Sequence, residues 1–176
     1  MTRTIRRAGQ GSYERITKAD LRRLGELALA DLQSLFSRIP ELGRCYRHRL
    51  FAIALCQGAA LHYLDGKNGV KDFDVWCFFR ASRVRPFPYR RNGTADFGNP
   101  KFGKSPGWEH LTGRRVDILG RSLDVPPSVT PGLVLRSYLS EGRTASARYL
   151  AAKAAVLIEP SDLLGTVVWP AQDERA

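Results

Sequence analysis

The sequence predicts an α+β fold in which a small mixed β-sheet is flanked by helices. Three apolar stretches have the composition of buried strands, namely RLFAIALCQ, DFDVWCFF and RRVDIL. A helical pattern precedes them, and a predicted C-terminal helical pair follows them. With 176 residues, 43% of them apolar, the chain is long enough for one domain with a single substantial core.

The predicted domain organisation begins with a flexible basic arm over residues 1–16, which is rich in arginine and nearly free of acids. A single domain is expected over residues 17–176, with its core in residues 49–121. Thr17 opens a Thr-Lys-Ala-Asp sequence that resembles a capping box, and apolar residues then follow at helical spacing up to the next proline. This pattern predicts an N-terminal helix that packs one face on the core.

The C-terminal helices are predicted within residues 131–158. Pro131 at the first turn and Gly142 just past the end delimit the first helix. Thr144 caps the second, whose predicted buried stripe consists of Ala147, Leu150, Ala151, Ala154 and Leu157. The last apolar run, LLGTVVW, is expected to add an edge strand or a hook.

Two aspartates alternate with apolar residues in the stretch DFDVWCFF. Successive side chains of a strand point to opposite faces, so Asp72 and Asp74 share one face with Trp76. Their Cα atoms would lie roughly 6.6 Å apart, close enough for both carboxylates to bind one hard cation. Asp117 lies between Val116 and Ile118 on a later strand. The alternative is that the aspartate pair is solvated and only marks the start of a strand.

A glycine turn precedes the aspartates at a fixed distance. Gly58-Ala59 follows the first buried strand, begins a helical stretch, and stands twelve residues before Asp72-Phe73-Asp74. A helix N-terminus has free backbone N–H groups and the positive end of the helix dipole, which favour a phosphate.

The glycine turn, the paired aspartates and the later single aspartate resemble the nucleotidyltransferase superfamily, the polymerase beta-like fold that includes aminoglycoside-modifying and toxin-type enzymes. The resemblance implies that Asp72, Asp74 and Asp117 are catalytic residues that bind Mg²⁺ and that Gly58 and Ala59 position a nucleoside triphosphate. Two residues depart from the family pattern: Ala59 replaces a usual Gly or Ser, and Gln57 replaces an apolar residue.

Two lysines are predicted to neutralise the triphosphate. Lys71 flanks the loop before the aspartates, and Lys153 comes from the C-terminal helices that would form the far wall of the cleft. Solvent exposure without any function is the alternative for both side chains.

The charge of the chain indicates an anionic partner, because it carries a formal charge of +11 with a pI near 10.1. A long connection without a strand is predicted from Arg80 to Gly113, with aromatic residues between its cations. Such residues favour single-stranded nucleic acid or a nucleotide base, although the aromatics could instead hold the loop on the sheet. The predicted nucleic-acid contacts are Arg80, Arg83, Arg85, Arg90, Arg91, Lys101 and Lys104.

A P-loop pattern also occurs in this connection, ending in Lys104-Ser105, but the flanking residues predict neither the preceding strand nor the following helix of a P-loop. No apolar segment is long enough to span a membrane, and the three cysteines show no zinc or disulfide spacing. A cytoplasmic protein is therefore expected.

The leading functional hypothesis is a metal-dependent nucleotidyltransferase that transfers a nucleoside monophosphate to a hydroxyl or phosphate acceptor. RNA, in particular tRNA, is the favoured acceptor, and the toxin-type relatives suggest an antitoxin protein as a partner. The alternatives are a non-catalytic nucleic-acid-binding protein and a P-loop phosphohydrolase that uses Lys104 and Ser105.

Overall fold

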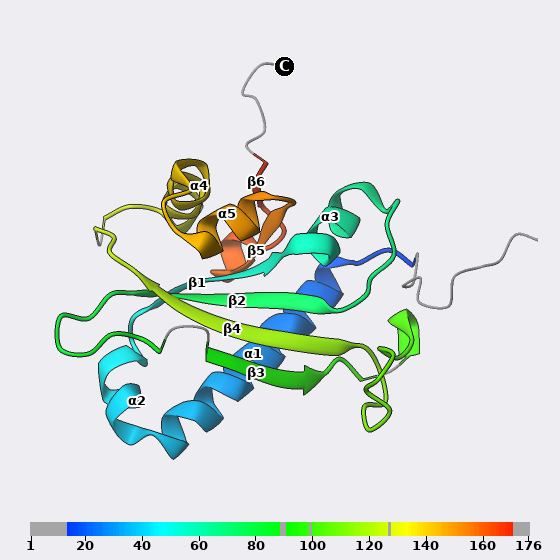
Figure 1. Cartoon of the computed structure of the whole chain (residues 1–176), viewed down its shortest axis with the longest axis horizontal. Helices are drawn as coiled ribbons and strands as arrows, with labels where there is room; N and C mark the ends of the chain where they lie inside the picture. Colours follow the sequence, from blue (N-terminus) through cyan, green and yellow to red (C-terminus); the bar gives the residue numbers. More distant parts are fainter. Residues whose placement is uncertain (1–13, 89–90, 99, 127, 171–176) are drawn as a thin grey trace, which may run out of the picture.

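The computed structural model describes residues 14–88, 91–98, 100–126 and 128–170. It confirms the predicted α+β fold: within these residues, five α-helices flank one mixed sheet of six strands (Figure 1). Residues 1–13 of the predicted basic arm lie outside the described residues. The arm cannot extend to residue 16, because Ile16 is 5% exposed and packs in the core.

The sheet has the strand order β3-β4-β2-β1-β5-β6. β2 and β4 run parallel, and every other neighbouring pair of strands is antiparallel. The strands are β1 (Leu50–Cys56), β2 (Phe73–Arg80), β3 (Arg91–Asp96), β4 (Arg115–Leu123), β5 (Ala155–Glu159) and β6 (Val167–Trp169).

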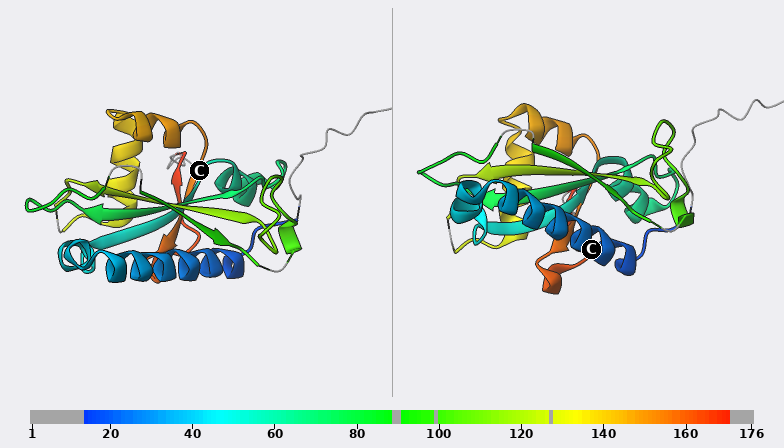
Figure 2. Two further views of the ribbon diagram at one scale, coloured as in Figure 1. Left: turned by 60° about the horizontal axis from the view of Figure 1, so that its bottom comes forward. Right: turned by 90° about the horizontal axis from the view of Figure 1, so that it is seen from below.

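The helices cover both faces of this sheet (Figure 2). In the left view, α1 and α2 lie on one side, and α4 and α5 lie on the other. No helix in the described part of the chain is both long and apolar enough to cross a membrane. The helices are α1 (Lys18–Arg38), α2 (Pro40–Tyr46), α3 (Gln57–Asp65), α4 (Pro131–Glu141) and α5 (Ala145–Ala151).

The predicted start of the N-terminal helix is confirmed by its cap. The Thr17 hydroxyl accepts a hydrogen bond from the Asp20 amide at 3.3 Å, and the Asp20 carboxylate accepts one from the Thr17 amide at 2.6 Å. These two bonds close the capping box that the sequence predicts.

Alternation along β2 divides the apolar side chains into two cores. Phe73 and Val75 belong to the core beneath α1, whereas Trp76 and Phe78 belong to the core beneath α4 and α5. Asp74 has the same parity as Trp76, so its carboxylate faces the side of α4 and α5. The alternation therefore decides on which side of the sheet the acidic residues meet.

The predicted strandless connection from Arg80 to Gly113 is wrong, because β3 lies within it and pairs with β4. Without β3, β4 would be an edge strand with unpaired N–H and C=O groups. The sequence RNGTAD lacks apolar alternation, so its hydrophobic pattern does not reveal the strand. Phe87, Phe97 and Phe102 are buried in the core, so these three aromatics hold the segment to the sheet.

The predicted C-terminal helical pair is confirmed, but its range of 131–158 is wrong at the end. The second helix stops at Ala151, and Ala155–Glu159 forms β5 between β1 and β6. A strand buried on both faces is continuously apolar, and hydrophobic spacing alone does not distinguish such a run from a helix. The run LLGTVVW contains β6. The prediction for this run is an edge strand or a hook, and the structure shows the edge strand.

The segment between β3 and β4 is fastened to the start of β2. Buried Arg114 donates to the Phe102 carbonyl oxygen at 2.8 Å and to that of Lys71 at 3.3 Å. The Ser105 hydroxyl donates to the Lys71 carbonyl oxygen at 3.2 Å and accepts from the Arg115 amide at 3.0 Å. Ser105 therefore links two strand starts. A strand, β3, does precede the P-loop pattern, contrary to the prediction, but the next element after Ser105 is strand β4 and not an α-helix, so the P-loop interpretation is wrong.

Asp96 closes the base of the same segment by accepting hydrogen bonds from the Gly98, Thr112 and Gly113 amides and from the Thr112 hydroxyl. Burial opposes ionisation of the carboxyl, but these hydrogen bonds outweigh it and lower the pKa of Asp96 to about 2. The carboxylate therefore stabilises the fold above its unfolded pKa of about 3.9, and this stabilisation is lost as the pH falls toward 2.

We predict that Asp96→Ala lowers the free energy of unfolding at pH 7 by about 1–2 kcal/mol, the net value of hydrogen bonds to one partly solvated carboxylate. Urea unfolding of both proteins at pH 7 and pH 2.5 measures the difference, which should shrink at the lower pH. Asp124→Ala removes an exposed carboxylate and serves as the control. Equal losses from the two substitutions would contradict the assigned role of Asp96.

Candidate functional site

Three aspartates meet where β2 and β4 begin. Parallel pairing makes Asp74 and Asp117 direct Cα partners, and Asp72 immediately precedes β2. The carboxylate side chains of Asp72 and Asp117 are only 21% and 14% exposed. The sequence predicts that Asp72 and Asp74 lie together, and the strand pairing brings Asp117 to them.

Arg115 joins two of these carboxylates, and the sequence analysis does not identify it. Its Nη2 lies 3.1 Å from Oδ2 of Asp72 and 2.6 Å from Oδ2 of Asp117. Its guanidinium carbon lies 4.6 Å from the centroid of the Trp108 ring. The signal in the sequence is its position two residues before Asp117, which puts both side chains on the same face of a strand.

Negative charge remains in excess around Asp74. Burial is the largest cause that raises its pKa, followed by the charges of Asp72 and Asp117, and together they bring the pKa to about 6. Burial also raises the pKa of Asp117, although Arg115 opposes this shift. The cluster therefore favours any further positive charge, whether a proton or a cation.

The turn between β1 and α3 faces the aspartates and has an unusual conformation. Gln57 has a φ of +64°, in the left-handed region that residues other than glycine rarely adopt. Its amide donates to the Ala154 carbonyl oxygen at 2.9 Å, and its side-chain amide donates to that of Tyr149 at 2.5 Å. These bonds explain the polar residue at a position where an apolar one was expected: Gln57 ties the turn to the end of α5.

Lys153 lies directly over this turn. A Cβ atom built on Gly58 would stand 3.7 Å from the Lys153 Nζ, so the amino group lies close to the backbone at the start of α3. Lys153 comes from the short segment between α5 and β5, not from a helix as predicted.

One cavity of about 500 Å³ unites these elements. The predicted catalytic and nucleotide-binding residues all line it, that is, Asp72, Asp74, Asp117, Gly58, Ala59, Lys71 and Lys153. Gln57, Arg115 and Tyr149, which the sequence analysis does not identify as site residues, line it as well. The structure therefore places carboxylates, cations and a helix N-terminus around one space.

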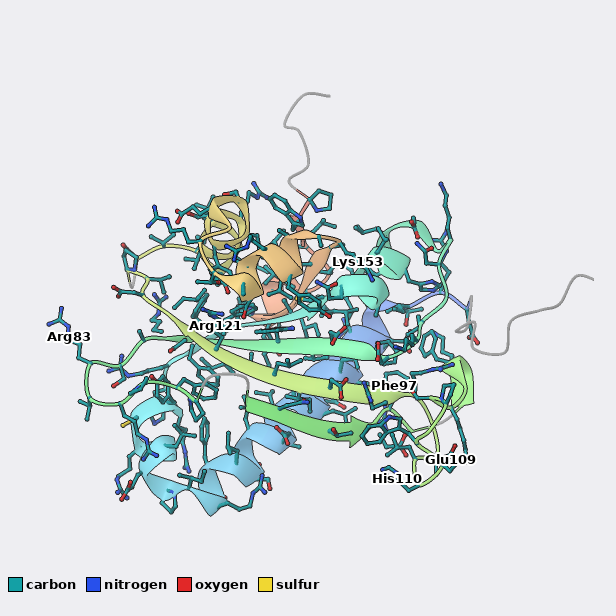
Figure 3. All side chains as sticks on the ribbon, in the orientation of Figure 1. Arg83, Phe97, Glu109, His110, Arg121 and Lys153 are labelled. Carbon is teal, nitrogen blue, oxygen red and sulfur yellow. The ribbon has the colours of Figure 1, made fainter. Side chains whose placement is uncertain are left out.

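The predicted nucleic-acid contacts are not brought together in the same way. Arg80 is the last residue of β2, about 20 Å along the strand from Asp74. Arg83 and Arg85 lie beyond the end of the strand. Figure 3 shows Arg83 at the left edge of the molecule, far from Lys153. The Arg85 Nη1 lies 3.0 Å from a Glu41 carboxylate oxygen.

Lys101 and Lys104 lie in the segment between β3 and β4. The Lys101 Nζ is 2.6 Å from an Asp20 carboxylate oxygen, and Lys104 is exposed. Arg90 and the side chain of Arg91 lie outside the described residues. Among the described residues, the predicted cations therefore do not form one surface beside the aspartates.

The donor chemistry of the site suits a hard divalent cation, because carboxylate oxygens are the ligands that Mg²⁺ prefers. Within the described ranges, no group of three or more His, Cys, Asp or Glu side chains is arranged to hold a metal ion as it stands. The Arg115 guanidinium lies between Asp72 and Asp117, so a cation that bound both would have to displace it. The ligand types fit the ion, provided that Arg115 moves.

Comparison of the chain with protein-family models, curated proteins and solved structures gives no match. The function must therefore be inferred from the residues and their geometry.

We predict that Asp74→Asn stabilises the protein at pH 7. The folded pKa of about 6 lies above the unfolded value, so the folded chain binds the proton more tightly, and stability falls as the pH rises from about 4 to 6. Asparagine avoids this loss of stability, which is about 3 kcal/mol for a shift of about two pKa units.

Urea unfolding of the metal-free protein at pH 4 and pH 7 measures the effect. The gain from Asp74→Asn should be present at pH 7 and nearly absent at pH 4, whereas Asp124→Asn should change neither value. A gain that is the same at both pH values would show that the repulsion among the carboxylates is not its cause.

Proposed function

We propose that the protein is a metal-dependent nucleotidyltransferase, which transfers a nucleoside monophosphate from a nucleoside triphosphate to an acceptor. One observation carries the proposal: Asp72, Asp74 and Asp117 face a helix N-terminus across a single cavity. This arrangement corresponds to the family resemblance in the sequence, with a glycine turn, a pair of aspartates and a third aspartate on a neighbouring strand.

The triphosphate would bind at the start of α3. The backbone N–H groups of Gly58 and Ala59 belong to the first turn of a nine-residue helix, where they have no partner within the helix. Lys153 beside Gly58 and Lys71, which lines the same cavity, bring positive charge to this space. Amides and ammonium groups in this arrangement favour a phosphate chain.

The three aspartates would bind Mg²⁺, which would polarise the phosphate oxygens and lower the pKa of the acceptor hydroxyl. Asp117, whose pKa is raised by burial, would take the proton from that hydroxyl. The hydroxyl oxygen forms a bond to the α-phosphorus as the bond to pyrophosphate breaks, and pyrophosphate leaves toward Gly58 and Lys153. Arg115 would release Asp72 and Asp117 to the metal and could then contact the substrate phosphates.

RNA, with tRNA as the first example, remains the proposed acceptor because the chain carries a charge of +11. A cytoplasmic location and an antitoxin partner remain part of the same proposal and rest only on the sequence.

We predict that label moves from at least one α-labelled nucleoside triphosphate to an acceptor in total tRNA when Mg²⁺ is present. Asp72→Asn/Asp74→Asn should reduce the transfer at least about 100-fold, because loss of even an outer-shell metal partner costs 10–100-fold. Asp162→Asn removes an exposed carboxylate in the turn after β5 and should have no effect. Transfer by the double variant at the wild-type rate would exclude the proposed site, and RNA binding without any transfer would favour the non-catalytic alternative.

We further predict that Lys153→Ala raises the KM for the nucleoside triphosphate about tenfold, because one phosphate contact is lost in a partly desolvated cavity. Steady-state kinetics measures this, with Lys67→Ala as the control, since Lys67 is exposed in the turn after α3. If both substitutions gave the same KM, Lys153 would not contact the triphosphate.

A further inference from the structure

A second cavity adjoins the first on the side away from the glycine turn. It has a volume of about 390 Å³ and is lined by Trp76, Asn92, Leu119, Ala145, Ser146 and Tyr149. Tyr149 lines both cavities, and the residue is 56% exposed. A volume above roughly 300 Å³ is typical of small-molecule sites.

The strand pairing fixes where this second cavity lies. Trp76 and Leu119 are Cα partners, and each lies two residues beyond an aspartate on the same face of its strand. Asn92 on β3 pairs with Leu119. Three features therefore follow one another across the sheet. The glycine turn lies at the end of β1, the carboxylates lie on β2 and β4, and the second cavity lies over β2, β4 and β3.

This order matches the requirement of an in-line displacement, in which the attacking oxygen and the leaving group lie on opposite sides of the phosphorus. If pyrophosphate leaves toward Gly58 and Lys153, the acceptor approaches from the opposite side of the carboxylates. That side is occupied by the second cavity. The inference that follows therefore rests on the proposed function.

The lining of the second cavity indicates a neutral, ring-shaped ligand. It includes two aromatic rings, an amide and a hydroxyl, and none of its six lining residues is Asp, Glu, Lys or Arg. The Nε1 atom of Trp76 is buried and has no hydrogen-bond acceptor in the described part of the chain. Rings that stack on a base, together with groups that bond its edge, are the usual means of binding a nucleoside.

We infer that this cavity binds a nucleoside whose ribose hydroxyl is the acceptor of the transferred nucleotide. The ribose oxygen forms the new bond to the α-phosphorus, its proton passes to Asp117, and pyrophosphate leaves from the other side. The nucleoside is either free or the end of an RNA strand.

The position of Arg121 provides a way to distinguish a free nucleoside from the end of an RNA strand. It is the next residue after Leu119 on the same face of β4, and its guanidinium carbon lies 5.4 Å from the centroid of the Tyr138 ring. Figure 3 shows Arg121 on the sheet well away from Lys153. Arg121 and several residues of α4 line a third cavity of about 530 Å³. An RNA strand that ends in the second cavity would bring its next phosphate to Arg121, whereas a free nucleoside would not reach it.

The first test uses no catalysis. Three tryptophans give three indole N–H signals in ¹⁵N-labelled protein, and Trp76→Phe identifies the signal of Trp76. Adenosine, guanosine, cytidine or uridine should shift this signal saturably, and Asn92→Leu should weaken the binding about tenfold. The Trp169 signal should stay unchanged, because its indole already donates to the Ala151 carbonyl oxygen at 2.7 Å. No shift with any nucleoside would overturn the inference.

The second test measures transfer to a short RNA with a free 3′ end and to the free nucleoside. Asn92→Leu should raise the KM for the acceptor about tenfold and leave the KM for the triphosphate unchanged. Arg121→Gln should raise the KM for RNA alone if RNA is the acceptor, and neither KM if the free nucleoside is. An effect of Asn92→Leu on the triphosphate alone would place the donor base in this cavity and overturn the inference.

The two proposals fail separately. A shift of the Trp76 signal without transfer of label by the wild-type protein would refute the nucleotidyltransferase and, with it, the acceptor role, while the cavity would remain a nucleoside site. Transfer of label without a shift of the Trp76 signal would refute only the nucleoside cavity.

Discussion

Parallel pairing of β2 with β4 is the constraint on which the site depends, because it places Asp74 beside Asp117 in a partly buried position. Two like charges about 4 Å apart repel by roughly 4 kcal/mol at an effective dielectric constant of 20. The fold holds them together with Arg115 between two of the carboxylates and with Ser105 and Arg114 bound to the carbonyl of Lys71. Because the repulsion among these carboxylates raises the free energy of the folded protein, the site has a high affinity for added positive charge.

The sequence predicts much of the framework because alternation is a local property. DFDVWCFF shows which side chains share a face, and the capping box at Thr17 marks the start of α1. Two strands were not predicted, for opposite reasons. The polar edge strand β3 has no apolar pattern, and β5 is apolar up to its last residue and therefore resembles a helix. Gln57 was not predicted because its partner Tyr149 is distant in sequence and comes close only in the folded chain. Arg115 is only two residues from Asp117, but its contact with Asp72 depends on the pairing of β2 with β4.

The net charge is evident from the sequence, but its placement is not. Some of the predicted contact residues form ion pairs within the protein, as Lys101 does with Asp20 and Arg85 with Glu41. Others lie far from the carboxylates. The path suggested for an acceptor instead follows β4 from Asp117 past Leu119 to Arg121, where neutral lining gives way to a cation.

The most direct test of the account is a crystal structure with Mn²⁺ and a non-hydrolysable nucleoside triphosphate analogue, in which anomalous scattering locates the metal. We predict that Mn²⁺ is bound by Asp72, Asp74 and Asp117 and that the phosphates lie at Gly58 and Lys153. Arg115 should have moved away from the two carboxylates that it contacts in the free protein. A structure with the analogue bound elsewhere, or with Arg115 still between Asp72 and Asp117 and no metal beside them, would contradict it.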